Sequence, residues 1–65
     1  MVNMAKKGIQ VVYWQNGKRN VFPRTFTAAL AAKAKAKAIL EWYGVECAEV
    51  IDWAVSGGLL AIFEK

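Results

Sequence analysis

The sequence contains no histidine and only one cysteine, Cys47, among its 65 residues. Without histidine, neither a serine–histidine–aspartate triad nor a cysteine–histidine pair can be assembled, which removes the common routes to nucleophilic hydrolysis. A lone cysteine excludes an intramolecular disulfide, and a tetrahedral zinc site lacks its usual ligands. We therefore expect a protein that is not an enzyme and that uses no metal or cofactor.

Long apolar runs are also missing. No stretch approaches the roughly 20 apolar residues that span a bilayer, and the first four residues do not resemble the apolar region of a secretory signal. A single unpaired thiol suits a reducing compartment. These features predict a cytoplasmic protein without membrane contact.

Acidic residues are absent from residues 1–40, which hold eight lysines and arginines. Residues 41–65 hold five acidic residues and one lysine, and the whole chain has a net charge of +4. Such a polarised distribution can steer a polyanion toward the basic half of the molecule.

Two hairpins and one helix are expected. Asn16 and Gly17 separate two β-branched and aromatic runs, a pattern typical of a hairpin with a type I′ turn. The resulting register pairs Gln15 with Lys18, Trp14 with Arg19, Tyr13 with Asn20, Val12 with Val21, and Val11 with Phe22. Alternation then places Ile9, Val11, Tyr13 and Phe22 on a core face, and Val12, Trp14, Arg19 and Val21 on the other face.

Strong helix formers occupy residues 28–43, between a predicted N-cap at Thr27 and a predicted C-terminal glycine at Gly44. Helical periodicity gives a buried stripe of Ala29, Ala32, Ala36, Ile39, Leu40 and Tyr43. On the opposite side it places Leu30, Lys33, Lys37 and Glu41.

A strand over residues 45–55, a turn at residues 56–58 and a strand over residues 59–63 complete the chain. A two-residue loop would pair Val55 with Leu60, Trp53 with Ile62, and Ile51 with Glu64. The prediction is one α+β domain over residues 8–65, with a ββαββ order, a four-stranded antiparallel sheet and one helix on one face. Residues 1–7 are expected to form a flexible arm.

One helix covers only one face of such a sheet, so the other face should be polar. Here both faces are apolar, which predicts an interface with a partner or with a second copy. The alternative is that the sheet curls or that the N-terminal arm covers this face. The candidate interface residues are Val12, Val21, Val50 and Phe63.

Basic and aromatic residues suggest a second kind of binding. Trp14 beside Arg19 can form a cation–π pair, and interleaved aromatic and basic side chains can stack on bases or contact phosphates. The alternative is a routine cross-strand contact on a solvated face, and likewise a solvated face for the helix lysines. The candidate binding residues are Trp14, Lys18, Arg19, Arg24, Lys33 and Lys37.

Two families share parts of this pattern. Lys18 and Arg19 in a strand, followed by residues 25–27 and an alanine-rich helix, resemble the hairpin-to-helix passage of the arm-binding domain of phage integrases. This resemblance covers about residues 11–40, and it implies contact with DNA through the sheet. The chain has one hairpin rather than three strands before its helix, and it adds a hairpin after it.

The layout of residues 8–65 is similar to that of small phage anti-CRISPR proteins of the ββαββ kind, in size, in element order, in the passage from the helix into a strand at 49–53, and in the short closing hairpin. The resemblance implies a stoichiometric inhibitor in the host cytoplasm that occupies the guide or DNA path of a CRISPR effector. Arg19, Lys33 and Lys37 would then make contacts.

Three hypotheses follow. The first is a non-catalytic protein of phage or mobile-element type that blocks a nucleic-acid-binding or nucleoprotein surface. The second is a DNA-binding module that uses the basic first hairpin. The third is a structural homodimer paired through the apolar sheet face.

Overall fold

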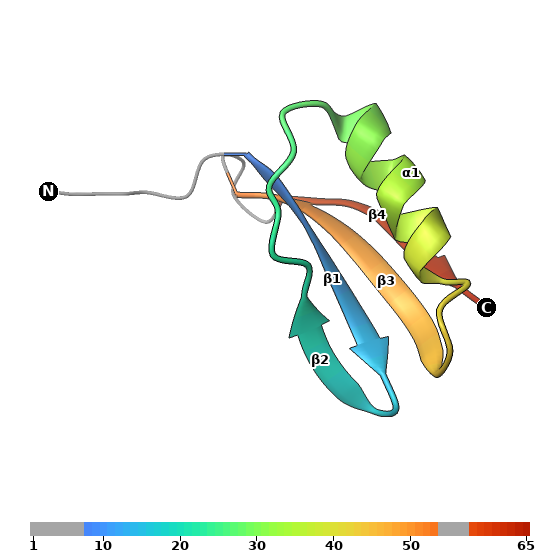
Figure 1. The fold of residues 1–65 in the computed structure, drawn as a ribbon. Coiled ribbons are helices and arrows are strands. Elements are labelled where there is room, and N and C mark those ends of the chain that lie inside the picture. The colour runs from blue at the N-terminus through green and yellow to red at the C-terminus, as the bar shows by residue number, and fades with distance from the viewer. Residues whose placement is uncertain (1–7, 54–57) are drawn as a thin grey trace, which may run out of the picture.

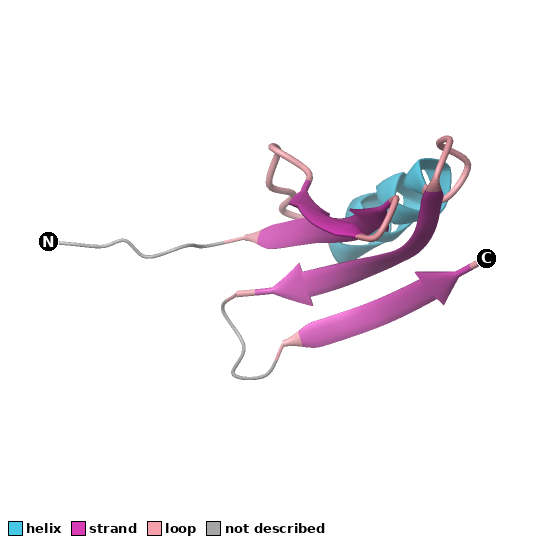
Figure 2. Cartoon of the chain, turned by 90° about the horizontal axis from the view of Figure 1, so that it is seen from below, coloured by secondary structure: helices cyan, strands magenta, loops and turns pink. Residues whose placement is uncertain are grey.

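The computed structural model describes residues 8–53 and 58–65. Within these ranges the chain forms four strands and one helix: β1 (Ile9–Gln15), β2 (Lys18–Val21), α1 (Ala29–Ile39), β3 (Val45–Asp52) and β4 (Leu59–Glu64). The strands build one antiparallel sheet in the order β2-β1-β3-β4, and α1 packs on one face of it (Figures 1 and 2). The predicted α+β architecture is confirmed, and the proposed arm at residues 1–7 lies outside the described residues.

The first hairpin has the predicted turn and register. Asn16 and Gly17 both adopt positive φ, 53° and 81°, as a type I′ turn requires. The four pairs from Val12 with Val21 to Gln15 with Lys18 form as expected. Beyond the last pair, the Phe22 N–H donates to the Val11 carbonyl at 2.8 Å. Local turn chemistry therefore determines this half of the sheet.

The helix is shorter than predicted at its C-terminal end. It ends at Ile39, and the chain then tightens through bonds from the Glu41 N–H to the Ala38 carbonyl and from the Trp42 N–H to the Ile39 carbonyl. The turn that follows docks on the first hairpin, where the Asn16 N–H donates to the Gly44 carbonyl at 2.9 Å. A helix continuing to residue 43 could not make this contact.

The early helix end changes which aromatic side chain packs against the first hairpin. Tyr43, predicted in the buried stripe, is 90% exposed, and that prediction is wrong. Trp42 makes the aromatic contacts instead and remains 39% exposed. Its ring lies edge-on to Tyr13 at a centroid distance of 5.5 Å and tilted against Phe22 at 6.3 Å. The N-cap prediction is also wrong, because the cap residue is Ala28, which has no side-chain capping bond.

The second hairpin is shifted by four residues from the predicted register. The observed pairs include Ala48 with Phe63 and Val50 with Ala61, with an irregularity after Val50. The connection is longer than a two-residue turn, because β3 ends at Asp52, whose N–H donates to the Gly58 carbonyl at 2.7 Å. Predicted pairing at Val55 lies outside the described residues. Because the shift is even for the pairs from Cys47 with Glu64 to Val50 with Ala61, the side chains of these pairs remain on the faces that alternation predicts.

The core lies between α1 and the central strands. Its helical members include two fully buried alanines, whose small side chains let the helix backbone approach the sheet. Phe26 ties the β2–α1 connection to the start of β1 through paired backbone bonds with Ile9, of 2.9 and 2.8 Å. The buried core residues are Ile9, Val11, Ala32, Ala36, Ile39, Leu40, Val45, Ala48 and Val50.

Candidate functional site

The sheet face that points away from α1 is the first candidate site, and we call it the open face. Alternation along the paired strands defines its members, because Val11 and Val50 face the helix and their neighbours must face away. The Trp53 indole N–H bonds to the Gln10 side-chain oxygen at 2.5 Å, which places Trp53 on the same face. The open face comprises Gln10, Val12, Trp14, Arg19, Val21, Cys47, Glu49, Ile51, Trp53, Leu60, Ile62 and Glu64.

The open face is largely apolar and partly exposed. Val21, Trp53 and Ile62 are 41%, 45% and 50% exposed, and Leu60 is also exposed. Val12 lies at the centre and is fully buried beneath its neighbours. Soluble monomers seldom expose a large contiguous apolar patch unless it serves an interaction. The predicted apolar outer face is thus present in the folded domain.

The charges on the open face are mixed. Consecutive pairing positions form a row across the sheet, Arg19–Trp14–Cys47–Glu64, with a basic and an acidic end. Burial, followed by the negative charges of Glu49 and Glu64, raises the pKa of the Cys47 thiol above its ordinary value of 9.0. The thiolate is therefore disfavoured, and Cys47 lacks the electropositive surroundings of a reactive cysteine.

The predicted basic residues do not form one patch. Lys18 and Arg19 follow the end of β1, whereas Arg24 lies near Phe26, which pairs with the start of β1. A seven-residue strand separates these two ends by roughly 20 Å. The remaining two predicted residues, Lys33 and Lys37, are on α1, in the other layer of the molecule.

The predicted stacking of Arg19 on Trp14 is not found, although the two residues pair across the strands. Within residues 8–53 and 58–65, the cations that lie over rings are Arg24 over Phe26 at 5.8 Å, Lys35 over Phe22 at 5.3 Å and Lys37 over Phe63 at 5.7 Å. These contacts depend on how the helix and its flanking segments dock on the sheet, which a strand pattern does not encode.

The predicted interface residues divide between the two faces. Val12 and Val21 belong to the open face, but Val50 is fully buried in the helix-side core and Phe63 packs against that core. Their prediction as interface residues is corrected, because the pairing of Val50 with Val11 turns this side of the second hairpin toward α1. The side chains of the second hairpin that lie on the open face are instead those on its opposite side, namely Ile51, Trp53, Leu60 and Ile62.

No family model, curated protein or solved structure matches this chain. Among the described residues, no group of three or more possible metal-ligating side chains gathers at one point. In the same part of the chain, no helix combines the length and apolar character needed to cross a membrane.

Proposed function

We propose that this chain is a small non-catalytic binding protein of phage or mobile-element type, which acts in the cytoplasm by covering a surface of a protein or nucleoprotein partner. The observation that carries the proposal is the apolar open face, with Val21, Trp53, Leu60 and Ile62 exposed on it. An inhibitor of the anti-CRISPR kind would work in this way, by occupancy rather than by chemistry.

The charge distribution favours a protein surface over direct contact with nucleic acid. The open face carries Glu49 and Glu64 beside Cys47, and phosphates would be repelled there. The basic residues are divided between the hairpin end, the β2–α1 segment and α1. Affinity for nucleic acid comes mainly from lysines and arginines that contact phosphates together, so this arrangement gives the DNA-binding hypothesis little support.

A second candidate is a homodimer, and one observation favours it. If two open faces stack about a two-fold axis parallel to the strands, the row Arg19–Trp14–Cys47–Glu64 is reversed in the second copy. Arg19 of each copy then lies opposite Glu64 of the other, across sheets that pack roughly 10 Å apart. The face is therefore complementary to itself in charge as well as in its apolar character.

The first experiment compares three forms of the chain in affinity capture from lysate, each with and without nuclease. Val21→Ser combined with Leu60→Ser removes two exposed open-face side chains. Tyr43→Ser is the control, because it removes a large exposed side chain that lies on the α1–β3 turn and outside the open face. We expect a defined partner that survives nuclease, is retained by Tyr43→Ser and is lost with the double variant. Capture that the double variant retains would contradict the proposal.

Sedimentation at several protein concentrations tests the homodimer. A face-to-face dimer would dissociate on dilution, would be disrupted by Val21→Ser with Leu60→Ser, and would protect Cys47 from alkylation at high concentration. A wild-type chain that remains a monomer up to millimolar concentration eliminates this candidate. That result leaves the open face available to a different protein.

A further inference from the structure

Among the strands of the described residues, β4 is an outer strand of the sheet, with β3 on one side and no strand on the other. The Lys65 N–H donates to the Glu46 carbonyl at 3.1 Å, and antiparallel pairs alternate between bonded and non-bonded positions. The register therefore directs the backbone groups of Ala61 and Phe63 toward β3. Those of Ile62 and Glu64 point outward, away from the sheet.

The two edges of the sheet differ in how they are protected. The β2 edge has only four residues, begins with Lys18 and Arg19, and is followed by Pro23. Charged residues, short length and proline are the usual devices against unwanted strand pairing. The β4 edge has six residues and only one charge, Glu64, at its end. It is the edge that can accept another strand.

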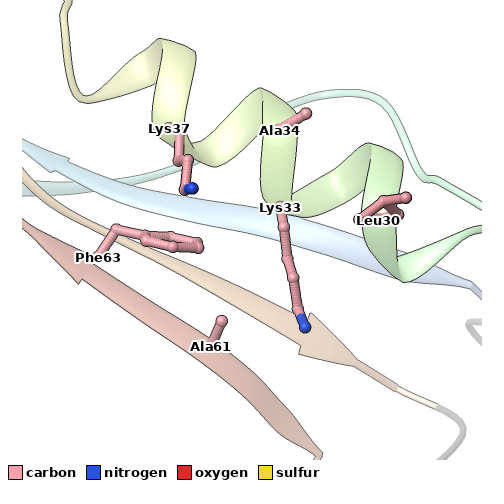
Figure 3. A pocket seen from close by; sticks show the side chains of 6 residues that line it. All are labelled: Leu30, Lys33, Ala34, Lys37, Ala61 and Phe63. Carbon is pink, nitrogen blue, oxygen red and sulfur yellow. The ribbon is translucent and has the colours of Figure 1, made fainter.

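A groove of about 430 Å³ runs between α1 and β4. Figure 3 shows the side chains of Lys33 and Lys37 descending from the helix toward the strand, where Phe63 and Ala61 lie below them. The Lys37 ammonium is 5.7 Å from the centre of the Phe63 ring. The groove thus combines an apolar floor with two amines that come from one side.

No carboxylate pairs with these two amines within the described part of the chain. The lysines are four residues apart, so they project from the same side of the helix. Glu64, the acidic residue nearest in sequence to Phe63, belongs to the open face because alternation turns it away. A ligand that fills the groove gains charge complementarity if it supplies acidic groups.

We propose that the β4 edge and this groove bind an extended segment of another protein, in which acidic and apolar residues alternate, as a fifth strand of the sheet. The segment's backbone would pair with the outward groups of Ile62 and Glu64. Its acidic side chains would face Lys33 and Lys37, and its apolar side chains would extend the open face beside Leu60 and Ile62. Strand addition of this kind combines backbone bonds for affinity with alternate side chains for specificity.

A second copy of the chain fits this edge less well. The β4 strand of a second copy would place Ala61 and Phe63 on the groove side, and neither residue is acidic. The second copy would also bring its own Lys33 and Lys37, which would add positive charge. Residues 1–7 also contain two lysines and no acid. Charge therefore selects a segment of a different protein.

The probe for the experiment is a fluorescein-labelled hexapeptide in which valine and glutamate alternate, and binding is followed by fluorescence anisotropy. We expect saturable binding by the wild-type chain and at least tenfold weaker binding of the same peptide with lysine in place of glutamate. Lys33→Gln combined with Lys37→Gln should weaken binding about tenfold, since each exposed ion pair contributes modestly. Lys35→Gln is the matched control, because Lys35 lies over Phe22, away from the groove, and should change binding less than twofold.

Backbone pairing is tested with Ile62→Pro, which removes an outward N–H but no bond to β3, against Ile62→Val, which keeps the N–H. We expect loss of binding in the first and less than a twofold change in the second, with circular dichroism confirming the fold. An N-methylated peptide tests the same bonds without altering the protein, and it should not bind. Absence of wild-type binding, equal binding of the methylated peptide, or equal effects of Lys35→Gln and the double variant would overturn the proposal. The lysine variants and the changes to the peptide leave the apolar open face intact, so failure of peptide binding leaves the proposed function standing.

Discussion

Gly44 shows how one residue joins two distant parts of the fold. It lies between α1 and β3 with a φ of +82°, and its carbonyl accepts the Asn16 N–H. A Cβ atom at this position would lie 2.5 Å from the Asn16 side-chain oxygen. Gln15 strengthens the same junction, because its side-chain amide donates to the Tyr43 carbonyl at 2.7 Å. The first hairpin and the α1–β3 turn are therefore held together by backbone geometry as well as by packing.

The first prediction concerns this junction. Gly44→Ala should lower the free energy of unfolding by more than the about 1–2 kcal/mol that left-handed backbone costs an alanine, because the contact with Asn16 adds to it. Gly17→Ala is the control, since Gly17 has a similar φ of +81° and nothing within 4 Å of an added Cβ. Urea denaturation of both variants measures the difference. Equal losses would show that the Asn16 contact has no energetic effect.

The second prediction concerns Cys47 and pH. Burial and the charges of Glu49 and Glu64 raise its pKa, so less thiolate is present at pH 8 than in an ordinary cysteine. Alkylation by iodoacetamide should be slower in the folded chain than in urea, and the midpoint of its pH–rate profile should lie at a higher pH in the folded chain, because the pKa of the thiol is raised there. Glu49→Gln should move that midpoint down and increase the rate at pH 8. A folded-state rate equal to the rate in urea would contradict this account.

At the scale of the element, α1 depends on the sheet. Its 11 residues include six alanines, and isolated helices of this length are marginal in water even when rich in alanine. Its first turn contains no acidic residue, and its N-cap, Ala28, makes no side-chain bond to the free N–H groups. The cap residue already has the extended backbone of a cap, with φ −119° and ψ 131°. Only a suitable side chain is missing.

The third prediction follows from that missing cap. Ala28→Asp should raise the free energy of unfolding by about 1 kcal/mol, because the carboxylate can accept a bond from a first-turn N–H and lies at the positive end of the helix. Thr27→Ala is the control, and it should change stability by less than about 0.5 kcal/mol because Thr27 is exposed and lies before the cap. Thermal unfolding of both variants would measure these effects. A large loss in Thr27→Ala would contradict the assigned cap.

At the scale of the whole molecule, the core is small. Ile39 is the largest of its fully buried side chains, and the others in that set are valines. Domains of this size typically have about 3–10 kcal/mol of stability in total. One large cavity can therefore remove most of the margin between folded and unfolded chains.

The fourth prediction uses this margin. Ile39→Ala should cost about 2–5 kcal/mol and Ile39→Val about 0.5–1.5 kcal/mol. Far-ultraviolet circular dichroism at 25 °C should then show a substantially unfolded population in the first variant and a native spectrum in the second. A fully native spectrum for Ile39→Ala at 25 °C would mean that stability comes from sources other than this core.

The sequence by itself determined the first hairpin, the existence of the helix and the alternation of faces along both hairpins. Each depends on interactions between near neighbours, such as the Asn16–Gly17 turn, whose two residues of positive φ favour the observed register of the hairpin. It also excluded catalysis by a histidine of this chain and an intramolecular disulfide, because composition alone decides both.

Only the tertiary structure decided where the helix ends, how β3 and β4 are aligned, and which side of the second hairpin is buried. These depend on contacts between residues far apart in the chain: Asn16 with Gly44, and Val11 with Val50. The same distant contacts moved Val50 and Phe63 to the helix side and set Lys33 and Lys37 above Phe63 and Ala61. Helix docking brings these groups together, and a one-dimensional pattern carries no information about it.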